Sequence, residues 1–146
     1  MERARIRPMA TTDAPRVAVL TTQLGYPVEA DELAPRLDEV QARTDDGLFV
    51  ATDADGEVVG WIHVARIALL EASGMALING LVVDEEARSA GIGTELVAAA
   101  ERWAREHGAT TIMVRSRSTR QRAHRFYERI GYAEVKRSHV FERPLV

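Results

Sequence analysis

Residues 88–93, Arg-Ser-Ala-Gly-Ile-Gly, place a cation and two closely spaced glycines directly before a predicted helix. Inside a helix, glycine lowers stability by about 0.5–1 kcal/mol relative to alanine, so helix formation does not explain these two glycines. Glycines let a ligand approach the backbone, and the first N–H groups of a helix lack intrahelical partners and carry part of the helix dipole. Together with the guanidinium of Arg88, this turn predicts a phosphate site.

Two common phosphate motifs do not fit this turn. A P-loop has Lys and then Ser or Thr after its last glycine, where this chain has Thr94 and Glu95. A dinucleotide-binding fingerprint has a third glycine, where this chain has Leu96, and an acid about 20 residues further on. On the hexapeptide alone, a tight strand-to-helix turn without a ligand stays an alternative.

The elements around the turn follow from the hydrophobic pattern. Residues 75–84 form a nearly continuous apolar run, typical of a strand buried on both faces, and residues 91–107 show the strongest helical periodicity. The other predicted strands lie at 4–9, within 47–70 on either side of a turn at 53–57, at 110–116, and once or twice within 132–145; the other helices lie at 11–25, 31–40 and 120–131. This order predicts an α/β or α+β fold with a mixed sheet.

Length and composition restrict the class of protein. With 146 residues, of which 46% are hydrophobic, the chain is expected to form a single domain, 1–146. The absence of cysteine excludes a disulfide framework and a thiol nucleophile, and the four histidines show no metal-ligand spacing. No run approaches the ~18 apolar residues of a membrane span, and residues 1–10 lack a signal-peptide core. We therefore expect a cytoplasmic protein that binds no metal and no membrane.

Charge is divided unevenly along the chain. The net charge is -3, which argues against a general nucleic-acid binder, but residues 1–111 carry a net charge of -9 and residues 112–146 a net charge of +6. The basic end indicates either contact with a phosphate-bearing ligand or a solvated helix face, and charge alone does not separate these interpretations.

A second segment, residues 123–132 (AHRFYERIGY), connects these observations. In their order along the chain, the two motifs resemble those of the GNAT superfamily of acetyl-CoA-dependent N-acetyltransferases. The nucleotide motif of that family reads Arg/Gln-x-x-Gly-x-Gly/Ala at a strand-to-helix turn. Its later element has an alanine, two residues, Phe-Tyr and a Gly-aromatic pair, which match Ala123, Phe126, Tyr127, Gly131 and Tyr132. The resemblance covers essentially the whole chain.

The resemblance implies a mixed, mostly antiparallel sheet of about six to seven strands flanked by about four helices. It implies acetyl-CoA as cosubstrate and Tyr127 as the group that faces the CoA sulfur and protonates the departing thiolate. The residues it assigns to the pantetheine arm are Leu81, Val82 and Val83, and those it assigns to the pyrophosphate are Arg88, Ser89, Ala90, Gly91, Ile92, Gly93 and Thr94. Arg120 stands where many members have an asparagine that contacts the cofactor, so Arg120 is expected either to bind a phosphate or to face solvent. The basic end is expected to lie near the 3′-phosphate.

The expected reaction is transfer of an acetyl group to a primary amine by direct attack in a ternary complex. The amine must first lose a proton, and the base is not evident. Asn79 cannot serve, because an amide is not a base; His63, Glu71 and His139 are candidates, and so is water that relays the proton to bulk solvent.

The acceptor is not identified by the sequence. A small-molecule amine is favoured, and a peptide or protein amine and a non-catalytic acyl-CoA sensor stay as alternatives. The acids Glu29, Asp31 and Glu32, in a segment expected to help form the acceptor wall, hint at a cationic acceptor. A homodimer stays an option.

Overall fold

The computed structural model describes residues 4–88, 90–116 and 120–146. The chain divides into two compact units, Met1–Arg115 and Ser116–Val146. The elements in chain order are β1 (Arg5–Pro8), η1 (Thr11–Asp13), α1 (Ala14–Leu24), α2 (Ala30–Gln41), β2 (Asp46–Thr52), β3 (Val58–Ile67), β4 (Met75–Val83), η2 (Glu85–Ala87), α3 (Ile92–Glu106), β5 (Thr111–Val114) and α4 (Gln121–Arg129). None of the helices in the described part of the chain is both long enough and apolar enough to span a bilayer.

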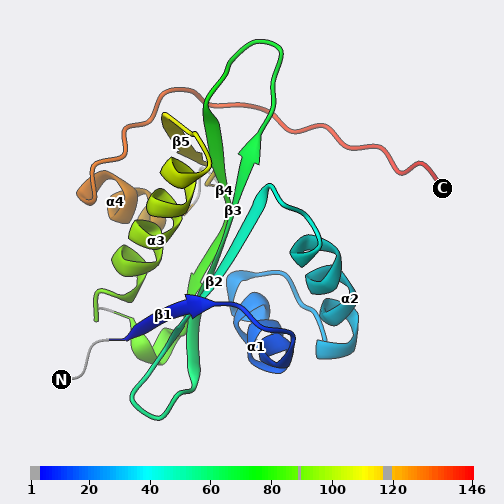
Figure 1. Ribbon diagram of the computed structural model, residues 1–146, viewed down its shortest axis with the longest axis vertical. Coiled ribbons are helices and arrows are strands. Elements are labelled where there is room, and N and C mark those ends of the chain that lie inside the picture. The colour runs from blue at the N-terminus through cyan, green and yellow to red at the C-terminus, as the bar shows by residue number, and fades with distance from the viewer. Residues whose placement is uncertain (1–3, 89, 117–119) are drawn as a thin grey trace. The chain divides into compact units, whose positions relative to one another are not determined.

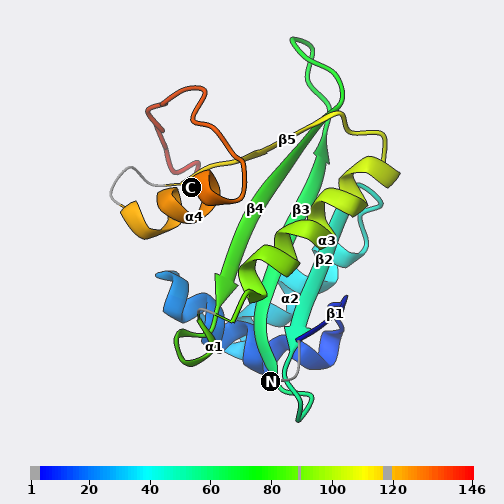
Figure 2. The same ribbon diagram turned by 90° about the vertical axis from the view of Figure 1, so that its left-hand side faces the viewer.

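The first unit is one sheet covered by helices on both faces. Its strands follow the order β1-β2-β3-β4-β5, and only the β4–β5 pair is parallel. In Figures 1 and 2, α1 and α2 cover one face of this sheet and α3 crosses the other. The mixed, mostly antiparallel architecture with four helices is therefore confirmed.

Two apolar layers hold the helices on the sheet. On the α1–α2 face, Val17, Leu20 and Leu37 pack with Val50 and Val82 of the strands. On the other face, the helical stripe of α3 is buried at Leu96, Val97, Ala100, Trp103 and Ala104. This stripe accounts for the strong periodicity of residues 91–107, because each of these positions faces the sheet.

The second unit contains α4 and a segment without regular structure. The predicted strand or strands within 132–145, and with them the count of six to seven strands, are wrong for the described residues, which form five strands. Val135, Val140 and Phe141 are at least 79% exposed, so their spacing does not create a buried face. A strand needs a partner for its backbone groups, and residues 133–146 pair with none in the described part of the chain.

An ion pair joins β1 to the start of α1. The guanidinium of Arg7 donates to both carboxylate oxygens of Asp13, at 2.8 and 2.9 Å, and the backbone N–H of Ala10 donates to Oδ2 at 2.7 Å. The hydrogen bonds from Arg7 lower the pKa of Asp13, although burial of the carboxyl opposes them. Ionised Asp13 therefore stabilises the fold above its unfolded pKa of about 3.9, and this contribution is lost as the pH falls through the lower folded value.

Asp13→Asn is expected to reduce the free energy of unfolding at neutral pH by about 1–2 kcal/mol, a modest value because Arg7 is partly exposed to water. The deficit should shrink as the pH falls through the lowered folded pKa of Asp13, because the wild-type carboxyl is then protonated as well. Urea unfolding across this pH range tests the prediction, with Asp38→Asn on the exposed side of α2 as control. A deficit that is the same at every pH would show that packing, and not the charge, is responsible.

Candidate active site

The C-terminal half of β4 has an open backbone edge. The β4–β5 pairs run from Met75–Thr111 to Ile78–Val114, and β4 continues to Val83 without further β5 partners among the described residues. Over residues 79–83, the N–H and C=O groups that would face β5 are therefore available to a ligand that carries amide groups, except that the Val83 carbonyl accepts from Nε of Arg88. This part of β4 contains Leu81, Val82 and Val83, which the family resemblance assigns to the pantetheine arm.

A β-bulge marks the point where the two strands separate. His63 pairs with Gly80 and Val64 pairs with Ile78, so Asn79 is the extra residue of β4 and is exposed. A Cβ atom on Gly80 would lie 2.7 Å from Cη2 of Trp61, so only glycine lets the indole ring pack against the backbone there. The bulge and the glycine together fix the course of β4 beside the open edge.

The turn after β4 leads into the first turn of α3. Gly91 is the N-cap residue of α3, with φ = +77°, and no atom lies within 4 Å of the position that a Cβ would occupy. Gly91 has no side chain that could cap the helix, so the N-cap residue itself fills none of the space in front of the N-terminus. The side chain of Ile92 is buried, where its Cγ2 would lie 3.4 Å from a Cβ on Gly60 of β3. The turn can thus present backbone N–H groups to an anion, together with the positive end of the helix dipole, which is equivalent to about half an elementary charge.

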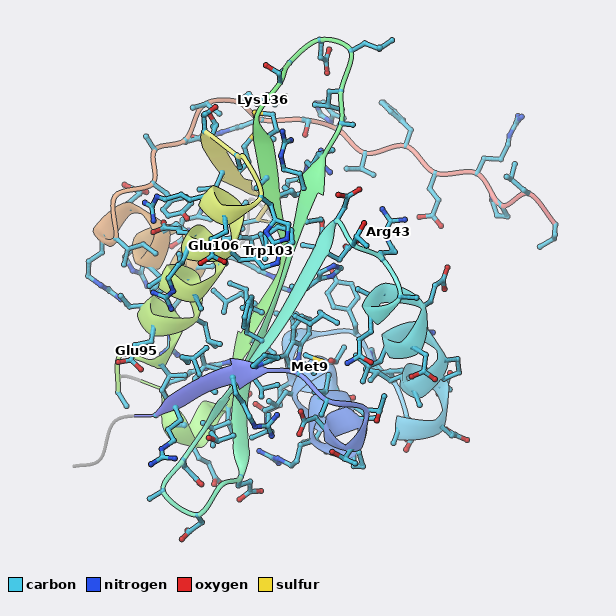
Figure 3. The ribbon with its side chains drawn as sticks, viewed as in Figure 1. Met9, Arg43, Glu95, Trp103, Glu106 and Lys136 are labelled. Carbon is cyan, nitrogen blue, oxygen red and sulfur yellow. The ribbon has the colours of Figure 1, made fainter. Side chains whose placement is uncertain are left out.

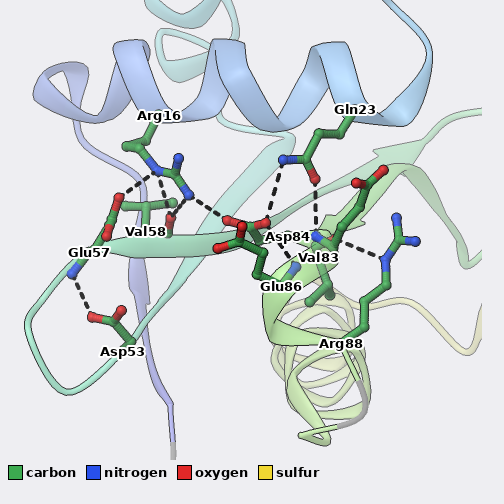
Figure 4. Close-up of polar contacts among 10 residues, drawn as sticks. Arg16, Gln23, Asp53, Glu57, Val58, Val83, Asp84, Glu86 and Arg88 are labelled. Atoms are coloured by element: carbon green, nitrogen blue, oxygen red, sulfur yellow. Dashed lines mark hydrogen bonds and ion pairs between the residues drawn. The ribbon is translucent and has the colours of Figure 1, made fainter.

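A polar network fixes the end of β4 to α1 (Figure 4). Asp84 accepts from Arg16 at 2.8 Å, from the amide of Gln23 at 3.5 Å and from the backbone N–H of Glu86 at 3.1 Å. The hydrogen bond from Glu86 is the main cause that lowers the pKa of Asp84, and Arg16 and Gln23 add to it against the effect of burial. Arg88 is exposed, and its Nε donates to the carbonyl of Val83 at 3.3 Å. These contacts hold the start of the turn in place.

Most of the predicted cofactor residues lie along this path. Leu81 and Val83 are half-buried, whereas the side chain of Val82 is in the core and its backbone pairs with Trp61 of β3. Gly93 is half-buried in the first turn of α3, and Ala90 and Thr94 are exposed. Ser89 lies outside the described residues. The turn and the open strand edge are thus continuous in one unit.

Tyr127 and Arg120 belong to the second unit. The ring of Tyr127 contacts Phe126 edge-on, with ring centres 5.2 Å apart, and is tilted against Tyr132 at 5.8 Å. Burial raises the pKa of Tyr127 to about 12, and the charge of Arg120 acts in the opposite direction. The phenol therefore keeps its proton throughout the physiological range, as a proton donor must.

The candidate bases differ in their surroundings. Glu71 and His139 are exposed and take part in no ion pair in the part of the chain that the structure describes. His63 is half-buried, and its Nε2 lies 2.7 Å from Oδ1 of Asp46. Asp46 also accepts from Nε of Arg43, which is labelled in Figure 3 where the chain passes from α2 to β2. Sequence reasoning did not single out Asp46, because its contact with His63 depends on the register of two strands.

Comparisons with known proteins agree with this geometry. The model of the acetyltransferase (GNAT) family matches residues 16–132. Aminoglycoside N(6′)-acetyltransferase type 1 of Stenotrophomonas maltophilia is 30% identical over 138 residues, which cover 92% of this chain and 90% of that protein. Aminoalkylphosphonate N-acetyltransferase of Salmonella typhimurium is 41% identical over 86 residues, which cover 58% of this chain and 54% of that protein.

A solved structure shows the same fold at low sequence identity. AAC(6′)-Iy, in complex with the bisubstrate analogue CoA-S-monomethyl-acetylneamine, superposes with a TM-score of 0.83 at 20% identity, covering 98% of this chain and 99% of that one. The family match spans both compact units, and it agrees with the motifs at Arg88–Gly93 and Ala123–Tyr132. The chain therefore belongs to the GNAT family and is an acetyl-CoA-dependent N-acetyltransferase.

Proposed function

We propose that this protein transfers the acetyl group of acetyl-CoA to a primary amine of a small molecule, by direct attack in a ternary complex. The observation that carries the proposal is the path from the helix N-terminus at Gly91 to the edge of β4 that has no β5 partner among the described residues. A pyrophosphate suits the first part of this path, because it is an anion. Pantetheine suits the second, because its amides can pair with a free strand edge.

Each assigned residue has a role in this proposal. The backbone of Arg88–Thr94 binds the pyrophosphate, and the guanidinium of Arg88 adds donors of matching geometry. The backbone of Leu81–Val83 pairs with pantetheine. Arg120 provides a positive charge for the cofactor, and the hydroxyl of Tyr127 donates a proton to sulfur. The full chain, 1–146, acts as one acetyltransferase domain.

The reaction then proceeds in one covalent exchange. A neutral amine nitrogen attacks the thioester carbon, and the resulting oxyanion accepts hydrogen bonds from backbone N–H groups near Leu81. The carbon–sulfur bond breaks, the thiolate takes a proton from Tyr127, and the amine nitrogen loses its proton to a base. The chain contains no cysteine that could form an acyl-enzyme, so the acetyl group passes directly to the amine.

A small molecule is the proposed acceptor because of the relatives. The two curated relatives described above are named for aminoglycosides and aminoalkylphosphonates, and both names denote small molecules that carry amines. Alignment to the first of them covers 92% of this chain, so it includes the α1–α2 region as well as the cofactor turn.

Release of free thiol from acetyl-CoA tests the proposal, measured with aminoglycosides, aminoalkylphosphonates, polyamines and lysine-containing peptides. The highest kcat/KM is expected for a small-molecule amine. A clear preference for peptides would contradict the proposed acceptor class. Tight binding of acetyl-CoA without turnover of any amine would identify a sensor instead.

A further inference from the structure

A buried carboxylate and an imidazole meet on the sheet face beside the bulge of β4. Asp46 of β2 accepts a hydrogen bond from Nε2 of His63 on β3 (2.7 Å), and the Asp46 side chain is only 6% exposed. Nε of Arg43 donates to the second oxygen of the same carboxylate at 2.6 Å. Burial alone would raise the pKa of Asp46, but the hydrogen bonds from His63 and Arg43 outweigh it and lower the value. Asp46 is thus ionised at neutral pH.

This contact fixes the proton on one nitrogen of the ring. An ionised carboxylate can only accept hydrogen bonds, so Nε2 of His63 carries a proton and Nδ1 of the neutral ring has a free lone pair. In the part of the chain that the structure describes, no group hydrogen-bonds Nδ1. The His63 side chain is 20% exposed, so a proton can pass between the ring and solvent. When Nδ1 takes up a proton, Asp46 stabilises the imidazolium.

The ring lies where the reaction must take place under the proposed function, on which this inference rests. With phosphates at Gly91 and pantetheine along Leu81–Val83, the thioester arrives at the level of Gly80. His63 is the β3 partner of Gly80, and paired residues of antiparallel strands project to the same face. Asn79, exposed at the bulge, leaves this point of β4 open to the acceptor.

We propose that His63 is the general base of the acetyl transfer and that Asp46 is its positioning residue. Nδ1 of His63 removes a proton from the amine as the nitrogen bonds to the thioester carbon. The carbon–sulfur bond breaks, and the sulfur leaves as a thiolate that takes its proton from the hydroxyl of Tyr127. His63 then releases the amine proton to bulk water, and Asp46 keeps Nε2–H in place throughout.

The charges around the ring suit this cycle. Asp46 faces the ring from β2, and Arg43 neutralises the second oxygen of that carboxylate from the segment before β2. The same-face neighbours Leu48, Trp61 and Gly80 carry no charge. Two further acids, Glu39 of α2 and Asp45 beside β2, act through their charge on Arg43.

Steady-state kinetics with the best acceptor test the proposal in wild type, His63→Gln and Asp46→Asn. The glutamine amide can still donate to Asp46, but it cannot take up a proton. We expect kcat to fall about 100-fold, and the acid limb of kcat/KM to disappear from the range in which imidazoles titrate, about pH 5–8. In Asp46→Asn, the side-chain amide can donate to Nε2 of His63, so the ring proton moves to Nδ1 and the base loses its free lone pair there. This variant should have a lower kcat and an unchanged affinity for acetyl-CoA.

His107→Gln is the matched control, because His107 stacks on Trp103 at the end of α3, with ring centres 3.9 Å apart. It should keep both kcat and the acid limb, and melting temperatures verify that all variants fold. If Asp46→Asn does not fold, His63→Gln decides alone. Wild-type turnover beside an undiminished kcat in His63→Gln, or an effect limited to the KM of the amine, would overturn this inference and leave the proposed function standing. No wild-type turnover with any amine would overturn both.

Discussion

Replacing Gly91 with valine is expected to lower the affinity for acetyl-CoA by about 10²–10⁴-fold. This range corresponds to the loss of two backbone hydrogen bonds to a charged phosphate, at about 1.5–3 kcal/mol each. A Cβ atom at this position would meet no protein atom within 4 Å, so the added side chain begins in the open space before α3. Calorimetric titration with acetyl-CoA measures the effect directly.

Backbone strain must be separated from loss of the site. Gly91 has φ = +77°, which an L-residue adopts only at a cost, and about 1–3 kcal/mol of stability is expected to be lost. Gly108 provides the matched control: its φ is +82°, its Cβ position is equally empty, and it lies at the other end of α3. Gly108→Val should lose similar stability and keep its affinity for acetyl-CoA.

The two variants together decide the assignment. A folded Gly91→Val protein with wild-type affinity would remove the pyrophosphate from this turn. Equal losses of affinity in Gly91→Val and Gly108→Val would show that the fold, and not the site, had been damaged.

Elements with one strongly buried face could be predicted from the sequence. The periodicity of 91–107 predicted α3 (Ile92–Glu106) because its apolar stripe meets the sheet, and the apolar run 75–84 predicted β4 (Met75–Val83) because helices cover both faces. Local patterns carry this information, since the spacing of buried residues in a helix or strand is fixed by its geometry.

Features that depend on pairing partners could not be predicted in the same way. The alternation within 132–145 is typical of a strand, yet Val140 is 88% exposed, because alternation does not supply a neighbour. The contact between Asp46 and His63 likewise depends on the β2–β3 register, which shifts at Ala51/Thr52. The sequence around Asp46, Thr-Asp-Asp-Gly, reads as a turn, so nothing local distinguishes this carboxylate.

Loss of the Tyr127 hydroxyl is expected to have the second large effect, which is on the turnover rate and not on the binding of acetyl-CoA. The pKa of this phenol, about 12, lies well above that of an ordinary thiol, about 8.5. Proton transfer to a free thiolate is therefore uphill, so the hydroxyl first donates a hydrogen bond to the sulfur as charge develops there, and the proton then passes to the departing thiolate. This places its contribution towards the lower part of the usual range for a general acid.

Tyr127→Phe is expected to reduce kcat by about 10²–10⁴-fold, nearer to the lower value, with little change in acetyl-CoA affinity. The substitution keeps the ring contacts with Phe126 and Tyr132 and removes only the hydroxyl. Because the pKa is about 12, wild type should show no basic limb from this group below about pH 11.

The control removes a hydroxyl from the neighbouring ring. Tyr132→Phe should keep kcat, because the resemblance assigns no proton transfer to Tyr132. An undiminished kcat in Tyr127→Phe would mean that the thiolate leaves without assistance, which its modest basicity permits. Equal losses in both variants would indicate damage to the packing of the three rings. A loss confined to Tyr127→Phe would identify this hydroxyl as the proton donor.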